Sequence, residues 1–339
     1  MLLVFPRLMF IFFFLFSPTR IPEKLNVNTP PPRIIRACCS FGNEVGITGI
    51  PFLKITEITS ASALGTHSYL GSKAEKNGII YTKKGGFIDI AHLRDIADIT
   101  AYLYANIQKN KNKGSMILPL GSEAGEKTLL VNIDPTLTDE DLVKIAGKAA
   151  YDLSVWHEIS TWNGASYIPL VPERYSSFSV EDAFSNLLGV HLGMKAILST
   201  RAYESEMTRL LTETLKTYEA VSSYQETVNA MNAVEGKWWS QKARYPSKDI
   251  LILRLFDIYG CLSPMLVETM GFSSEKLCVP DSTKAGRPLD DFYSLKIKAN
   301  FRIPIKDVFG IPEHTKDITQ RDFPILIAHA KKQENGERK

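Results

Sequence analysis

Two short stretches of the sequence place an imidazole close to a carboxylate, a combination that proteins use to bind metals and to move protons. His157 and Glu158 are adjacent, and Asp89 precedes His92 by three residues, which puts the latter pair on one face of a helix. A zincin helix also begins with His-Glu, but it needs a second histidine four residues after the first, and Thr161 occupies that position. Zinc would therefore need ligands from elsewhere in the chain.

A third group of polar side chains lies at the start of another predicted helix. Glu181 and Asp182 open this helix, and Asn186 follows within an otherwise apolar stretch. Polar groups on a buried face must be hydrogen-bonded, so they indicate either an internal network or a site. Trp162, at the end of the His157 helix, is a further candidate for the same cleft.

We therefore expect these three groups to converge in one cleft. His92, His157, Asp89 and Asp182 would bind a Zn²⁺-like ion with an open coordination position, and Glu158 would be the general base. His157 would be the base if no metal binds. The leading hypothesis is a metal-assisted hydrolase that acts on cell-envelope material or a small molecule.

Two alternatives remain open. The same residues could form a buried hydrogen-bond network in a non-enzymatic binding or scaffolding protein of the envelope. Asp89 with His92, or Glu158 with Glu181, could instead be a metal-free acid/base pair acting on a glycan. Each residue also has an ordinary explanation, since carboxylates are stabilised in the first turn of a helix and histidines in its last turn.

The helix that carries His157 is the best-defined element of the sequence. Thr138 and Asp141 have the spacing of a capping box, and apolar residues then recur at three- and four-residue steps as far as Trp156. Asn163 and Gly164 provide a left-handed end.

Other elements follow from the same patterns. We expect strands at 79–82, 129–133 and 294–301, and helices over 87–107, from 179 onward, over 202–235 and from 322 onward, with a helix or strand at 249–260. The predicted fold class is α+β and predominantly α-helical, a helical core with a few short strands.

Composition excludes little, but it argues against a nucleic-acid partner. The chain has 339 residues, 44% of them hydrophobic, and its 40 basic and 37 acidic residues give a net charge of +3. Nucleic-acid surfaces are usually much more basic.

The N-terminus differs from the rest of the sequence. Residues 1–16 are almost wholly apolar but too short to form a spanning helix, which indicates a signal peptide or an N-terminal anchor. Residues 17–37 contain five prolines and form a tether. Residues 38–339 are expected to be a single mainly helical domain, in which 280–339 could be a small α/β extension. We expect an exported protein, periplasmic or membrane-anchored, that contacts the membrane only through its N-terminal segment.

The four cysteines fit export without proving it. Cys38 and Cys39 are adjacent and cannot easily bridge each other, whereas Cys261 and Cys278 are far enough apart to pair. The pairing is left open by the sequence.

Four stretches together resemble the bacterial domain-of-unknown-function family 4056. They are RACCSFG at Arg36–Gly42, GGFIDIAHLRDIADITAYL at Gly85–Leu103, YDLSVWHEISTWNG at Tyr151–Gly164 and SSFSVEDAFSNLLGVHLG at Ser176–Gly193. The resemblance implies an exported or envelope-associated protein without an established activity, and it assigns no catalytic residue.

Overall fold

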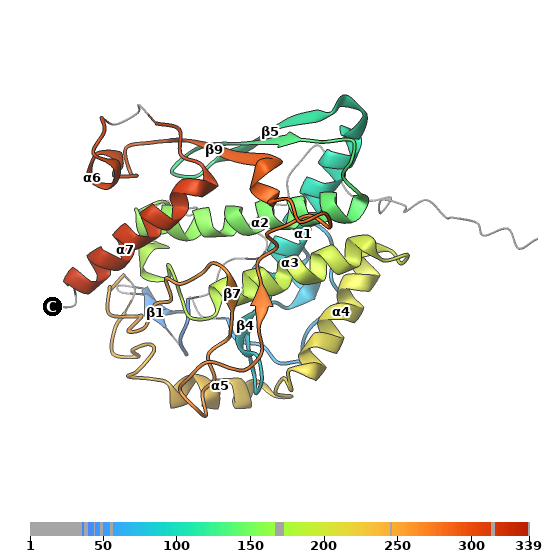
Figure 1. The fold of residues 1–339 in the computed structure, drawn as a ribbon. Helices are drawn as coiled ribbons and strands as arrows, with labels where there is room; N and C mark the ends of the chain where they lie inside the picture. The colour runs from blue at the N-terminus through green and yellow to red at the C-terminus, as the bar shows by residue number, and fades with distance from the viewer. Residues whose placement is uncertain are drawn as a thin grey trace, which may run out of the picture.

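The computed structural model describes residues 36, 40–43, 45–47, 50–54, 57–166, 173–244, 246–312 and 316–337. The expected leader, most of the tether, and Cys38 and Cys39 lie outside the described residues. The fold is α+β and mostly helical, as the sequence predicts (Figure 1).

The helices are α1 (Ile90–Lys109), α2 (Asp139–Trp162), α3 (Asp182–Leu198), α4 (Tyr203–Thr217), α5 (Tyr224–Ala233), α6 (Ile305–Phe309) and α7 (Phe323–Glu337). The strands are β1 (Gly46–Ile47), β2 (Ile50–Lys54), β3 (Ile79–Thr82), β4 (Gly86–Asp89), β5 (Ser115–Ser122), β6 (Gly125–Asn132), β7 (Cys261–Leu262), β8 (Leu277–Cys278) and β9 (Tyr293–Ala299).

Helices α1, α2 and α3 pack against one another and form the centre of the core. Helix α2 begins as predicted, because Thr138 accepts a hydrogen bond from the Asp141 amide while the Asp141 carboxylate accepts one from the Thr138 amide. Helices α1 and α3 approach very closely, since a Cβ atom at Gly189 would lie 2.2 Å from the Leu93 carbonyl oxygen. This close approach brings the first turns of α1 and α3 together.

A three-stranded antiparallel sheet in the order β5-β6-β9 covers one side of the helices (Figure 1). Strand β6 alternates buried and exposed residues, and β9 pairs with it along its whole length, from Gly125 opposite Ala299 to Val131 opposite Tyr293. Both β9 and α7 contact α2. The segment expected as an extension, 280–339, is thus attached to the central helix.

The structure corrects two predicted elements. The single helix expected over 202–235 is two helices, α4 and α5, because Glu219 adopts a left-handed backbone (φ 55°) and Ser223 caps a new helix with Glu226. The apolar stretch at 249–260 is neither a helix nor a named strand; its side chains fill the core from an irregular segment, with Ile250 and Leu251 fully buried. A continuous apolar run is consistent with any buried element and does not specify its type.

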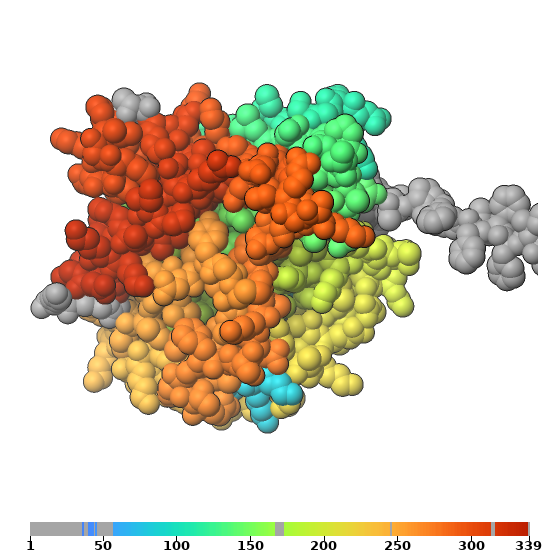
Figure 2. Space-filling view, in the orientation of Figure 1, coloured from blue at the N-terminus to red at the C-terminus, as the bar shows by residue number. Residues whose placement is uncertain are grey.

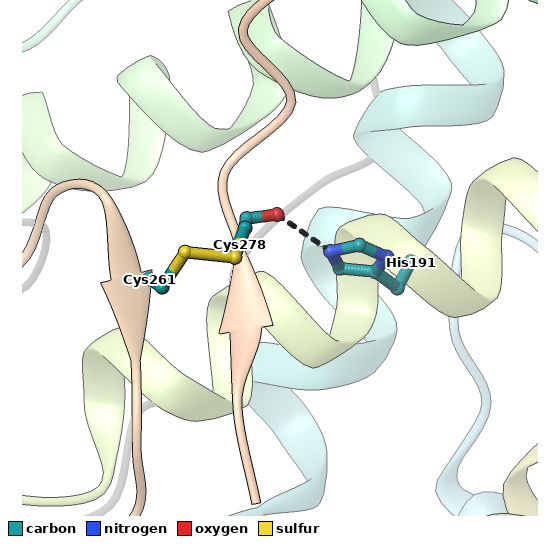
Figure 3. Close-up of a disulfide and its surroundings, with 3 residues drawn as sticks. All are labelled: His191, Cys261 and Cys278. Carbon is teal, nitrogen blue, oxygen red and sulfur yellow. Dashed lines mark hydrogen bonds between the residues drawn. A yellow bond between two sulfur atoms is a disulfide. The ribbon is translucent and has the colours of Figure 1, made fainter.

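A disulfide joins Cys261 of β7 to Cys278 of β8 (Figure 3). The Nε2 atom of His191, on α3, lies 2.9 Å from the Cys278 carbonyl oxygen, which fastens this hairpin to the helical core. The orange stretch that carries the hairpin lies across the front of the molecule in Figure 2, between the red C-terminal region and the yellow α4 region. Among the described residues, no helix is both long and apolar enough to cross a bilayer.

We expect the double substitution Cys261→Ser/Cys278→Ser to lower the free energy of unfolding by about 3 kcal/mol, because the bridge closes a loop with a sequence separation of 17 residues. Urea unfolding of the variant and of the unmodified chain measures the difference. The unmodified chain treated with a reductant should match the variant, since both cysteines are exposed. Equal stability with and without the bridge would contradict the expectation.

Candidate functional site

The first turns of α1 and α3 bring four of the expected site residues together. Asp89 is the last residue of β4 and caps α1, where its carboxylate accepts hydrogen bonds from the amides of Ala91 (2.7 Å) and His92 (3.1 Å). His92 Nδ1 lies 3.0 Å from Asp182 Oδ1, at the start of α3. We call Asp89, His92, Glu181 and Asp182 the His92 cluster.

Ser185 connects the two helices within the His92 cluster. Its hydroxyl donates to the Glu181 carbonyl (2.7 Å) and accepts the Asp89 amide (2.9 Å). Ser179 donates a very short hydrogen bond to Glu181 Oε2. In the described part of the chain, Asp89 Oδ2 and Glu181 Oε1 are buried without a hydrogen-bond partner. The cluster therefore holds three carboxyl groups against one imidazole, all of them shielded from solvent.

Burial changes the acidity of this cluster. Desolvation raises the pKa of Asp89, an effect that His92 partly offsets and that Asp182 increases. Desolvation, followed by repulsion from Asp182, also raises the pKa of Glu181 well above its ordinary value. Burial and the nearby Asp89 raise the pKa of Glu57. Because like charges this close repel one another, burial and repulsion together favour the protonated form of Glu181.

His157 belongs to a different group. Its Nδ1 atom lies 2.6 Å from Oε1 of Glu123, a residue of the turn between β5 and β6, and Glu123 Oε2 pairs with Lys127 at 2.7 Å. The neighbouring Trp156 donates to the Glu123 carbonyl at 2.8 Å. His157 thus fastens the sheet to α2.

Glu158 also has a structural contact. Its carboxylate accepts the Phe178 amide at 2.6 Å, in the segment between α2 and α3. Phe178 has a φ of 58°, a costly conformation for a bulky residue, so this hydrogen bond supports a strained turn.

The two remaining expected site residues are Trp162 and Asn186. Trp162 donates a hydrogen bond to Gln333 of α7 at 2.8 Å, and Asn186 is buried within α3.

The expected metal ligands do not fit a zinc site. Among the described residues, no three His, Cys, Asp or Glu side chains are grouped so that they could hold an ion. His92 and Asp182 lie together with Asp89, but His157 is bonded to Glu123 instead. A structural zinc site takes four ligands and a catalytic one usually three.

The structure contains a group of buried charges that the sequence did not predict and that is larger than the His92 cluster. We call it the Arg36 network. The Arg36 guanidinium bonds Glu75 twice (2.8 Å each), Asp98 (2.8 Å) and Asp95 (3.1 Å). Asp98 in turn contacts His67 (2.9 Å) and accepts from Tyr203 (3.0 Å). Desolvation opposes ionisation of Glu75, but hydrogen bonds from Arg36 outweigh it and hold the pKa of Glu75 at about 2.

A second missed group lies where α2 meets β9. Lys148 Nζ contacts both oxygens of Asp152 (2.8 and 2.9 Å) and the Tyr293 hydroxyl (3.2 Å), and Tyr259 donates to Asp152 at 3.1 Å. Burial raises the pKa of Asp152, and Lys148 partly offsets this rise. The i, i+4 spacing of Lys148 and Asp152 within an apolar helix was a usable signal for a buried pair. Arg36 has no comparable local signal, because all its partners are distant in sequence.

A family model described as "Protein of unknown function (DUF4056)" matches residues 26–268. The chain belongs to this family. The DUF4056 match spans the Arg36 network and the His92 cluster, whereas β9 and α7 lie beyond it. It assigns no activity. No curated protein and no solved structure is similar enough to match.

We expect Glu181→Gln to remove a pH dependence of stability. In the folded protein Glu181 keeps its proton above its ordinary pKa of about 4.5, whereas in the unfolded chain it ionises there. The folded state then binds more protons, so the free energy of unfolding falls as the pH rises, by up to about 1.4 kcal/mol per pH unit. The amide cannot ionise and should flatten this slope.

Urea unfolding between about pH 5 and pH 8 measures the slope in both proteins. Glu140→Gln is the matched control, because Glu140 is half exposed at the start of α2 and should leave the slope unchanged. An identical slope in Glu181→Gln and the unmodified chain would show that Glu181 ionises normally.

We expect Arg36→Met to destabilise the protein by about 3–5 kcal/mol, because it leaves three buried carboxylates without their cation. Lys111→Met is the control, since Lys111 pairs with Asp139 in solvent and should cost at most about 1 kcal/mol. Urea unfolding monitored by tryptophan fluorescence compares the two. A loss below about 1 kcal/mol for Arg36→Met would mean that the network is not a major source of stability.

Proposed function

We propose that this DUF4056 protein is a non-enzymatic binding or scaffolding protein of the cell envelope. One observation carries the proposal: the residues that could do chemistry lie in separate, largely buried groups, and each contacts a residue of another part of the fold. His92 pairs with Asp182, His157 pairs with Glu123, and Glu158 holds the Phe178 amide. Each contact joins two elements of the fold, which is the role of a buried polar network.

The exposure of the His92 cluster also supports a structural role. A general base must reach a water molecule or a substrate proton within hydrogen-bonding distance. Asp89 and Glu181 are 0% and 1% exposed, and the His92 residue is 8% exposed. In this arrangement the carboxylates are shielded from solvent.

The envelope location is supported by the disulfide. Cys261 and Cys278 are bridged although both are exposed, and exposed bridges persist in oxidising compartments such as the periplasm. Together with the apolar residues 1–16, this supports export, with any membrane contact made by the N-terminal segment.

A metal-assisted hydrolase is the second candidate. One observation favours it, because Asp89 Oδ2 and Glu181 Oε1 are buried without hydrogen-bond partners among the described residues, near the contact between His92 and Asp182. Excess buried negative charge attracts either protons or a cation. For the non-enzymatic function, protons on the carboxyl groups offset this charge in place of a cation.

Metal content separates the two candidates. We expect the full chain, purified without a tag, to contain far less than one equivalent of zinc, measured by inductively coupled plasma mass spectrometry, because no three ligands are grouped among the described residues. Stoichiometric zinc that is lost in Asp182→Asn and retained in the exposed control Asp257→Asn would overturn the proposal. Substoichiometric zinc in all three proteins would support it.

A further inference from the structure

A hollow of about 280 Å³ lies between α4, the loop before η2 (Lys73–Glu75) and α1. Its walls include Arg94, Lys216 and Thr212, together with the apolar side chains of Leu64, Leu211 and Leu215. We call it the Arg94 hollow. Its volume lies just below the roughly 300 Å³ at which the range for small-molecule pockets begins.

The charged side chains that line the hollow are all positive. Arg94 and Lys216 both line it, and none of the described residues in its lining is acidic. In a chain whose charges nearly balance, two cations without a carboxylate around one concave surface favour an anionic occupant.

Arg94 is unusual among the buried cations because it is not hydrogen-bonded to a carboxylate. Its guanidinium donates to the carbonyl oxygens of Gly65 (2.7 Å) and Glu75 (3.1 Å) and to the amide oxygen of Asn77 (2.9 Å), which are all neutral. Its Nε atom is buried without a hydrogen-bond partner in the described part of the chain. The Glu75 carboxylate lies 3.9 Å away and bonds Arg36 instead.

Burial makes this charge costly. Desolvation, opposed by Glu75 and reinforced by Arg36, lowers the pKa of Arg94 to about 10. The residue is 0% exposed, so its charge acts through the wall of the hollow, where the low dielectric strengthens electrostatic attraction. An anion in the hollow would compensate a cation that the protein leaves only partly neutralised.

We propose that the Arg94 hollow binds a small amphipathic anion, with one carboxylate or phosphate group attracted by Arg94 and Lys216 and a short apolar body against the leucines. This inference deepens the proposed function, because it names the binding site and the chemical class of its ligand. The site lies within the residues matched by the family model.

The experiment titrates the full chain with hexanoate, hexyl phosphate and hexylamine, which share one apolar body and differ in charge. We expect either anion to bind with saturable heat in isothermal titration calorimetry and hexylamine to show no binding. The tighter of the two anions identifies the head group. Binding of hexylamine as tight as that of the anions, or no binding of either anion, would overturn the proposal.

Three variants locate the site. Lys216→Glu reverses an exposed charge of the lining and should weaken binding of the anions about tenfold, equivalent to about 1.4 kcal/mol. Ala61→Phe should block the hollow and abolish binding, because Ala61 is an exposed lining residue. Lys113→Glu makes the same charge change in η3 (Lys111–Lys113), outside the lining, and should bind normally. Unchanged affinity in Lys216→Glu and Ala61→Phe would overturn the assignment.

These results are separable from those of the metal experiment. Stoichiometric zinc would overturn the non-enzymatic function without affecting anion binding at the Arg94 hollow. Failure of the anions to bind would remove this site and leave the metal result as it stands.

Discussion

A charge buried in a protein is costly unless it is paired, and this constraint organises the core of the molecule. Arg36 is 3% exposed and its guanidinium is surrounded by the carboxylates of Glu75, Asp95 and Asp98. Taking such ions out of water costs several kcal/mol each, which is recovered only if the geometry satisfies nearly every donor and acceptor. Arg36 is therefore held to α1 by its contacts with Asp95 and Asp98.

The same constraint explains why the polar residues do not form one open site. Each of the three groups on the central helices lies where two elements meet: α1 with α3 at His92, α2 with the sheet at His157, and α2 with the turn before α3 at Glu158. Apolar packing is tolerant of small displacements, whereas a buried hydrogen bond is not. These contacts thus fix how the helices are registered against each other. The His92 cluster adds an excess of carboxyl groups, and burial together with their mutual repulsion raises the pKa of Asp89 and of Glu181.

The sequence predicted well what local rules control. Thr138 and Asp141 specified the start of α2, and the alternating pattern at 294–301 predicted the strand that the structure has at Tyr293–Ala299, because capping and strand periodicity depend on near neighbours. The long apolar stripe over 202–235 was misleading, since its periodicity continues across the break at Glu219. The partners of His157 and Arg36 were not predictable from one sequence, because Glu123 and Asp98 lie 34 and 62 residues away. At the candidate site, the first turns of α1 and α3 lie together at His92 and Asp182, whereas His157 contacts Glu123 instead.

Strand β9 lies beyond the residues matched by the family model, yet it supplies the outer partner of β6 and the Tyr293 hydroxyl that reaches Asp152. A recombinant fragment cut at residue 268 would leave the backbone donors and acceptors of β6 unpaired along one side. Such an unpaired strand edge promotes aggregation by pairing with the edge of another molecule. The cut would also remove the Tyr293 hydroxyl, which contacts both Lys148 and Asp152. Expression trials on this protein should therefore keep the last seventy or so residues, although the match to the family model ends before them.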